Sequence, residues 1–230
     1  MNTNWSEYRC HDIDSKLKIA KFYPLDVMIT GVTGAGKSTT LNSLFQKNVA
    51  KVGSGVDPET MELDSYKLNE VFRIWDTPGL GDCVDIDKIH EKKLVDLLYK
   101  TYSLDENTYG FIDMAIVIIE GANRDMGTTY KLLNEVIVPN IQNDRIFIVI
   151  NQADVAMKGR HWDHENNKSD NKLQKFLDEQ ALSIKNRIKE ATNIDVITPI
   201  YYSAEKNYNV NVFFDFIIDN MPLSRRNLIK

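Results

Sequence analysis

The sequence of 230 residues predicts a three-layer α/β fold built on a mostly parallel sheet. Two continuous apolar runs, at 115–119 and 146–150, are typical of strands that are covered on both faces. Helix-length segments separate these runs from the other strand-like segments, as the right-handed crossovers of a parallel sheet require. We therefore expect a six-stranded sheet with one antiparallel strand and with helices on both faces.

The order of the elements follows from the alternation of apolar runs and helical patterns. The first strand is expected at 25–30. The antiparallel strand is expected from hairpin spacing, because only Asn69 and Glu70 separate two strand-like segments. The expected elements after the first strand are a helix at 37–46, a loop at 52–60, strands at 61–68 and 71–75, a helix at 86–102, a strand at 114–120, a helix at 128–138, a strand at 146–150, a long loop at 158–172, a helix at 173–191, a strand at 196–202 and a helix at 210–220.

Composition and charge limit the possible functions. The chain is 43% hydrophobic, which suffices for one globular core, and its net charge of −5 does not favour nucleic-acid binding by bulk electrostatics. Its two cysteines form neither a metal-binding spacing nor a disulfide framework, and no apolar run approaches the ~20 residues of a membrane span. We expect a cytoplasmic protein whose basic end, with Arg225, Arg226 and Lys230, is solvated.

A complete phosphate-loop motif follows the first expected strand, since residues 31–38 read Gly-Val-Thr-Gly-Ala-Gly-Lys-Ser. Its glycines let backbone N–H groups turn toward a phosphate, and the next helix N-terminus favours negative charge. We expect Lys37 to contact the β- and γ-phosphates and the Ser38 hydroxyl to ligate Mg²⁺. A chance glycine-rich turn is the weaker alternative. The expected phosphate-binding residues are Gly31, Thr33, Gly34, Ala35, Gly36, Lys37, Ser38 and Thr39.

Two further motifs stand after later strands, where ligands of such sheets bind. Residues 76–79 read Asp-Thr-Pro-Gly, so Asp76 can hold Mg²⁺ through a water and the Gly79 N–H can contact a γ-phosphate. Residues 151–154 read Asn-Gln-Ala-Asp. The Asp154 carboxylate would accept two parallel N–H bonds from guanine, which adenine does not offer together, so the sequence favours GTP over ATP.

Ser203 and Ala204 follow the last expected strand, and their backbone N–H groups can bond guanine O6. Each motif alone is a weak signal, and its other interpretation is an ordinary loop. Their order and their common placement at strand ends make a nucleotide site the better interpretation. The expected base-binding residues are Asn151, Gln152, Asp154, Ser203 and Ala204.

These motifs, with Thr60 between them, resemble the translation-factor-related P-loop GTPases over about residues 25–221. More narrowly, 76–82 and 159–163 look like the bacterial, often prophage-associated, Era-like proteins labelled ribosome-binding GTPases. The resemblance implies the Ras-like P-loop NTPase fold. From the pattern along the chain we expect a helical extension at 1–22, a GTPase domain at 23–222 and a basic tail at 223–230. The resemblance also implies Mg²⁺ held by Ser38, Thr60 and, through water, Asp76. A ribosome or protein effector is implied by analogy alone.

Three positions depart from the family pattern. Gln152 stands where lysine is usual, so the ammonium contact to the phosphate loop is expected to be lost. Leu80 stands where many relatives have a water-orienting glutamine, and Gly34 replaces the asparagine of potassium-activated relatives. The phosphate loop is closer to those of septins and immunity-associated GTPases, which implies a homodimer across the nucleotide face.

The expected activity is slow, Mg²⁺-dependent hydrolysis of GTP to GDP and phosphate as a conformational switch, with Lys37, Thr60 and Gly79 as catalytic residues. Arg124 is a further candidate from a partner subunit, although local pairing is its plainer interpretation. The alternative is a dimerising or partner-binding module with negligible hydrolysis. A nucleotide kinase fits less well. His90 is expected on a solvated helix face, and residues 161–162 either cover the base or anchor their loop.

Overall fold

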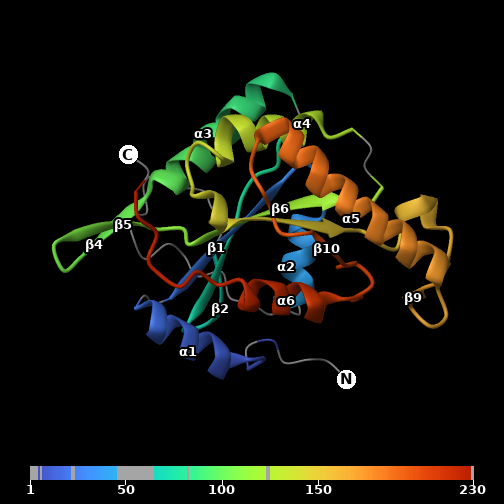
Figure 1. The fold of residues 1–230 in the computed structure, drawn as a ribbon, viewed down its shortest axis with the longest axis horizontal. Helices are drawn as coiled ribbons and strands as arrows, with labels where there is room; N and C mark the ends of the chain where they lie inside the picture. Colours follow the sequence, from blue (N-terminus) through green and yellow to red (C-terminus); the bar gives the residue numbers. More distant parts are fainter. Residues whose placement is uncertain are drawn as a thin grey trace.

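The computed structural model describes residues 5, 7–21, 24–45, 65–81, 83–122 and 125–228. Within these residues the central sheet has six strands in the order β10-β7-β6-β1-β3-β2 (Figure 1). Only β2 runs antiparallel to its neighbour, which confirms the predicted sheet. The strands are β1 (Leu25–Gly31), β2 (Ser65–Asn69), β3 (Phe72–Asp76), β6 (Met114–Glu120), β7 (Ile146–Asn151) and β10 (Ile200–Tyr201).

Helices cover both faces of this sheet, as predicted. Figure 1 shows α3 and α4 on one side of it and α1 and α6 on the other. The first layer contains α3 (Val84–Tyr99), α4 (Gly127–Lys131), which continues as a π-helix over Leu132–Ile137, and α5 (Asn171–Thr192). The second layer contains α1 (Cys10–Ala20), α2 (Lys37–Phe45) and α6 (Val210–Asp219).

Most of the core lies in two apolar layers, one on each face of the sheet. A third, smaller cluster consists of Ala153, Ala156, Trp162, Leu173 and Leu177. In β1, Val27 and Ile29 pack into the layer with α1, α2 and α6, whereas Met28 packs into the layer with α3, α4 and α5. The alternation follows from the two-residue repeat of a strand. Every residue of β1 is buried, so this strand fixes the position of the phosphate loop that follows it.

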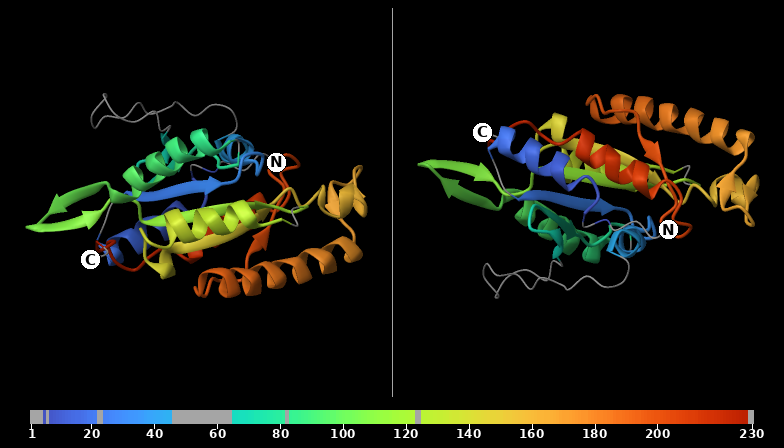
Figure 2. Two further views of the ribbon diagram at one scale, coloured as in Figure 1. Left: turned by 90° about the horizontal axis from the view of Figure 1, so that it is seen from above. Right: turned by 90° about the horizontal axis from the view of Figure 1, so that it is seen from below.

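The predicted helix at 86–102 is wrong at its end, because α3 stops at Tyr99. Residues 101–110 form a hairpin, β4 (Thr101–Leu104) paired with β5 (Asn107–Gly110), which projects from the body of the molecule (Figure 2). Asp105 and Glu106 turn the chain with φ of 49° and 64°, a left-handed conformation that ends any helical pattern. This short hairpin carries no glycine at its turn, and the sequence therefore lacked the usual signal.

Two other predicted segments also differ in detail. The strand expected at 196–202 is paired only over Ile200–Tyr201. The loop expected at 158–172 contains a small hairpin, in which β8 (Trp162–Asp163) pairs with β9 (Lys168–Ser169) before α5 begins. The predicted loop at 52–60, residue 46 of the predicted helix and the start of the predicted strand at 61–64 lie outside the described residues.

Both ends of the described chain pack against the sheet and its helices. Tyr8 and Arg9 bond the carboxylate of Asp215 on α6, and Trp5 packs against Phe214. The expectation of a solvated basic end is wrong for Arg226, which is only 1% exposed. The division of the chain into a helical extension at 1–22, a GTPase domain at 23–222 and a basic tail at 223–230 stays a prediction. No helix among the described residues is long and apolar enough to cross a membrane.

Candidate functional site

The phosphate loop lies between the end of β1 at Gly31 and the start of α2 at Lys37. Gly34 and Gly36 have φ of 87° and 84°, which residues with a Cβ rarely adopt. At Gly36 space is also lacking, since a Cβ there would lie 2.2 Å from Nδ2 of Asn151. Both requirements explain why the loop that joins this strand to this helix is rich in glycine.

Lys37 is nearly buried, and its ammonium folds back over the loop. Its Nζ donates to the carbonyl oxygens of Gly31 and Val32 at 3.2 and 3.0 Å. The segment after β3 lies directly against it, because a Cβ on Gly79 would be 2.7 Å from that Nζ. Leu80 O also accepts the Thr33 N–H at 2.8 Å. The Asp-Thr-Pro-Gly segment and the phosphate loop therefore meet beside the Lys37 ammonium.

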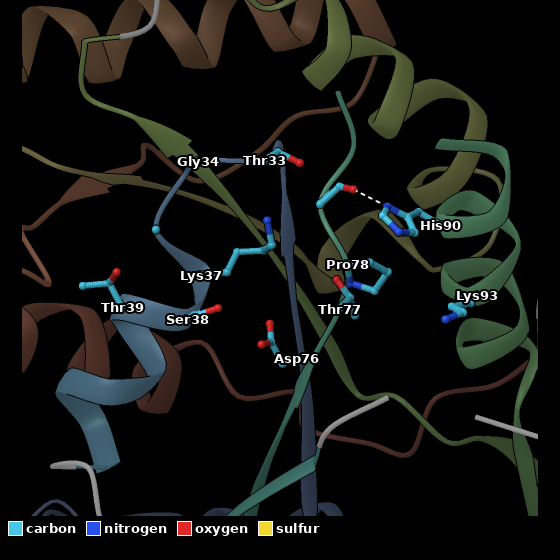
Figure 3. Close-up of a pocket in the computed structure, with 12 residues that line it drawn as sticks. Thr33, Gly34, Lys37, Ser38, Thr39, Asp76, Thr77, Pro78, His90 and Lys93 are labelled. Carbon is cyan, nitrogen blue, oxygen red and sulfur yellow. Dashed lines mark hydrogen bonds between the residues drawn. The ribbon is translucent and has the colours of Figure 1, made fainter. Parts of the chain in front are cut away.

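A cavity of about 580 Å³ opens beside these two segments. In Figure 3, Ser38 from α2 and Asp76 from β3 lie close together on one side of it, below Lys37. Their oxygens are the hard donors that Mg²⁺ prefers when phosphates supply further ligands. The described residues contain no group of three or more His, Cys, Asp or Glu that could hold a metal alone. The cavity is lined by Thr33, Gly34, Gly36, Lys37, Ser38, Thr39, Asp76, Thr77, Pro78, Gly79, His90 and Lys93.

A second cavity of about 260 Å³ adjoins the first, since Gly36 and Thr39 line both. Asn151 organises it: Nδ2 donates to Ala35 O at 3.0 Å, and Oδ1 accepts the Ala204 N–H at 3.0 Å. One side chain thus joins the phosphate loop to both of the motifs expected to bind the base. The second cavity is lined by Gly36, Thr39, Asn151, Gln152, Asp154, Val155 and Glu205.

Of the expected base-binding residues, Asp154 lines the second cavity and Ser203 does not. Asp154 is 7% exposed and lines the second cavity. Ser203 is fully buried, and its hydroxyl accepts the Lys206 N–H at 3.2 Å, so its side chain shapes the loop rather than lining that cavity.

Gln152 corrects one expectation. Its Nε2 donates to Gly34 O at 2.8 Å, so this amide keeps a contact to the phosphate loop that was expected to be lost with the ammonium. The backbone of Gln152 has φ of 61°, which turns the chain sharply after β7. Glutamine is shorter than lysine, but the turn brings it close enough to reach the loop.

The expectation that His90 lies on a solvated helix face is wrong. His90 is half-buried and lines the cavity of about 580 Å³, which we call the phosphate cavity. Its Nδ1 lies 2.6 Å from Gly79 O (Figure 3). The sequence contained a signal for this placement: His90 precedes the buried Leu94 and Leu97 by four and seven residues, which is the spacing of one inward helix face. Leu80, in contrast, is 1% exposed and packs in the core.

The remaining candidates lie away from both cavities or outside the described residues. Trp162 is buried and packs edge-on against Tyr208, and His161 bonds Asp170 at 2.7 Å. These contacts favour the interpretation of residues 161 and 162 as loop anchors. Thr60 and Arg124 lie outside the described residues, so their roles stay predictions.

Comparison with known proteins identifies the family. The model of the 50S ribosome-binding GTPase family matches residues 26–188, which is more than half of the chain. This chain belongs to that family. Its matched segment includes the phosphate loop, the Asp-Thr-Pro-Gly segment and the Asn-Gln-Ala-Asp segment at 151–154, so the fold is that of a P-loop GTPase.

Individual relatives differ in how much they share with this GTPase. The probable GTP-binding protein EngB of Mycoplasma pneumoniae is 23% identical over 194 residues, which cover 84% of each chain. Human Septin-12 is 32% identical over 105 residues, 40% of this chain and 29% of the septin. The chain thus spans less than a third of the length of that septin. Toc33 of Arabidopsis thaliana, solved with Mg²⁺ and GMPPNP, has a TM-score of 0.59 at 16% identity over 96% of both chains, a likeness of fold.

Proposed function

We infer that this GTPase binds GTP and GDP with Mg²⁺ and hydrolyses GTP slowly, as a conformational switch in the cytoplasm. One observation carries the inference: two adjoining cavities share Gly36 and Thr39, one beside Lys37 and the other beside Asp154. A guanosine triphosphate has the same division into an anionic end that needs a cation and a base that needs paired acceptors.

Different residues of the chain bind the phosphates and the Mg²⁺ ion in this proposal. Lys37 and the loop amides bind the phosphates, and Ser38, Thr60 and, through water, Asp76 hold Mg²⁺, which neutralises phosphate charge when it is bound. Lys37 would exchange its two bonds to loop carbonyls for bonds to phosphate oxygens, which are stronger acceptors because they are charged. Arg124 is proposed to act from a partner subunit.

The switch is proposed to depend on the contact between the two loops. The Leu80 carbonyl holds the Thr33 N–H, and Gly79 lies against the Lys37 ammonium. A γ-phosphate would compete for the same ammonium and push Gly79 away, so that the Gly79 N–H turns to the phosphate. GTP and GDP would then favour different positions of residues 77–81.

The second candidate is a nucleotide-dependent dimerising or partner-binding module with negligible hydrolysis. It is favoured by the burial of Leu80, which leaves that position without a water-orienting group. A dimerization-deficient variant of Toc33 has also been solved, and its fold matches this chain with a TM-score of 0.59. The family name and an Era neighbour at a TM-score of 0.51 suggest a ribosomal partner, by analogy.

Nucleotide selectivity tests the proposal. Calorimetry with GTP, GDP, XTP and ATP should show tight binding of the guanine nucleotides and weak binding of ATP. Asp154→Asn replaces a double acceptor by a mixed donor and acceptor, so it should move the preference toward xanthosine nucleotides. Asp195→Asn, at an exposed carboxylate that pairs with Lys189, is the matched control. Equal affinity of the unmodified protein for ATP and GTP would contradict the guanine assignment.

Turnover at a series of protein concentrations separates the two candidates. A dimer-assisted GTPase should release phosphate faster than in proportion to its concentration, and Arg124→Ala should remove that excess without changing GTP affinity. A binding module should release almost none at any concentration.

A further inference from the structure

The burial of Leu80 leaves open which group orients the attacking water, and the phosphate cavity itself offers an answer. His90 and Lys93 lie one helical turn apart on α3 and both line this cavity (Figure 3). They approach it from the α3 side, across from Ser38 and Asp76.

The hydrogen bond of His90 defines which ring nitrogen is available. Gly79 O can only accept, so the Nδ1 that lies 2.6 Å from it carries the hydrogen. In the neutral ring Nε2 is then an acceptor, and it has no hydrogen-bond partner among the described residues. A ring held at one nitrogen and open at the other is the arrangement by which a histidine binds and orients a second group.

The other cavity-lining side chains fit the task less well. Lys37 and Lys93 only donate when charged, and the Thr77 hydroxyl is committed to Ile29 O at 2.8 Å. Ser38 and Asp76 are the oxygen donors proposed for Mg²⁺. Among the lining residues that the structure describes, His90 is the remaining side chain with a basic acceptor atom.

We propose that His90 is a catalytic residue of the GTPase reaction, whose Nε2 accepts a hydrogen bond from the attacking water while Nδ1 holds the Gly79 carbonyl. The inference rests on the proposed GTP hydrolysis. The water oxygen forms a bond to the γ-phosphorus, the bond from that phosphorus to the β,γ-bridging oxygen breaks, and GDP leaves with that electron pair. The proton of the water passes by way of Nε2 to the phosphate product.

The same bond couples the water to the switch. One ring nitrogen holds Gly79 O and the other would hold the water, so a shift of residues 77–81 toward the γ-phosphate would move the ring and the water together. Lys93 adds a positive charge to the same cavity, which favours the charge that develops on the phosphate.

Two substitutions separate the two nitrogens. In His90→Asn the amide nitrogen overlaps the position of Nδ1, so the bond to Gly79 O is kept and the outer nitrogen is lost. In His90→Gln the amide extends toward the position of Nε2. His11→Asn, at an exposed histidine on α1, is the matched control. The assay measures phosphate release under saturating Mg²⁺ and GTP, the Kd of GTP, and the urea midpoint of each variant.

His90→Asn should lower kcat by about 10²-fold, the low end of what a positioned acid or base contributes, while the GTP Kd and the urea midpoint change little. His90→Gln should recover part of the rate, because its amide oxygen can accept from the water. His11→Asn should match the unmodified protein.

His90→Asn with an unchanged kcat would overturn the role of Nε2 and leave His90 as a structural support for Gly79. That outcome would leave the proposed GTPase intact. A protein that binds GTP and releases no phosphate at any concentration would instead overturn hydrolysis and the role of His90 together.

Discussion

The charged residues at the two ends of the central strands have different surroundings. We call these ends the carboxyl edge and the amino edge of the sheet. At the carboxyl ends of the parallel strands, Lys37, Asp76 and Asp154 line two adjoining cavities. At the amino ends, Asp26 and Asp113 are buried among other side chains. Both edges bury charge, but only the carboxyl edge leaves space beside it. Burial of a charge therefore does not by itself mark a functional site in this protein; the adjoining cavity does.

At the amino edge, charged side chains bond one another and backbone carbonyl oxygens. Asp26 accepts from Arg73 at 2.7 and 2.8 Å and from Trp75 Nε1 at 2.8 Å, and its N–H donates to Asp113 at 2.9 Å. Arg145 donates to the carbonyl oxygens of Asp113 and Ser224. Such a network gains little over apolar packing, but removing one member leaves the others unpaired.

The first prediction concerns Arg226, which closes this edge. Its guanidinium is buried and donates to the carbonyl oxygens of Leu98 and Asn140. Arg226→Ala leaves both acceptors unpaired and opens a cavity, so it should lower the free energy of unfolding by about 3 kcal/mol. Urea denaturation measures this loss.

Arg225→Ala is the matched control for Arg226. Its side chain is half-buried and stacks on Tyr102 and Tyr109, so its loss should cost about 1 kcal/mol. GTP affinity should stay unchanged in both variants, because neither residue lines a nucleotide cavity. Equal losses for the two arginines would show that the last residues are not anchored as described.

The second prediction concerns pH. Burial raises the pKa of Asp113 to about 7. Between about pH 4, where the carboxyl of the unfolded chain titrates, and pH 7, the folded state therefore holds the proton more firmly than the unfolded chain. The contribution of Asp113 to stability is largest at low pH and falls, by up to about 1.4 kcal/mol per pH unit, as pH rises through this window.

Asp113→Asn should remove that slope, because its amide oxygen still accepts the Asp26 N–H and carries no titrating proton. The free energy of unfolding, measured in urea at pH 5 and pH 8, should differ less between the two pH values in the variant. Asp96→Asn, at an exposed position on α3, should keep the original difference. A variant slope equal to that of the unmodified protein would contradict the burial of Asp113.

The third prediction turns to the carboxyl edge. Lys37→Ala removes the cation of the phosphate loop, so GTP affinity should fall at least ten-fold, about 1.4 kcal/mol. Stability should fall much less than in Arg226→Ala, since the loop carbonyls that accept from Lys37 can turn to water. Calorimetry measures the affinity. If a folded Lys37→Ala variant bound GTP with unchanged affinity, the assignment of the phosphate site would be wrong.

Much of the carboxyl edge could be predicted from the sequence because its chemistry depends on short, local patterns. The phosphate loop needs glycines at fixed spacing, and β1 and β7 are mostly apolar and buried throughout. The sheet and the placement of Lys37, Asp76 and Asp154 follow from these patterns. The roles of Thr60 and Arg124 rest on sequence alone, since both lie outside the described residues.

The amino edge could not be predicted in the same way, since it depends on contacts between distant segments. Arg226 is buried where the last described residues meet α3 at Leu98 and the turn after the π-helix at Asn140, which both offer carbonyl oxygens. Gly110 bonds the Arg226 carbonyl from the hairpin that the helical pattern concealed. Such pairings leave no local signature, so a buried arginine near a chain end looks like a solvated one.

The smallest effect is expected at Gln152, where the carboxyl edge shows a contact that the sequence did not predict. Its amide joins the guanine motif to the phosphate loop through Gly34 O. A half-exposed neutral hydrogen bond contributes about 0.5–1.5 kcal/mol, so Gln152→Ala should weaken GTP binding by roughly two- to ten-fold. Gln152→Lys should bind GTP at least as tightly as the unmodified protein, because its ammonium can reach the same carbonyl and adds a positive charge near the phosphates. Calorimetry at fixed salt compares the three proteins, with Gln174→Ala, exposed on α5, as control. If Gln152→Ala bound GTP as tightly as the unmodified protein, the contact to Gly34 would not contribute to nucleotide binding. Only the charged residues of the carboxyl edge would then be left as side chains expected to determine GTP affinity.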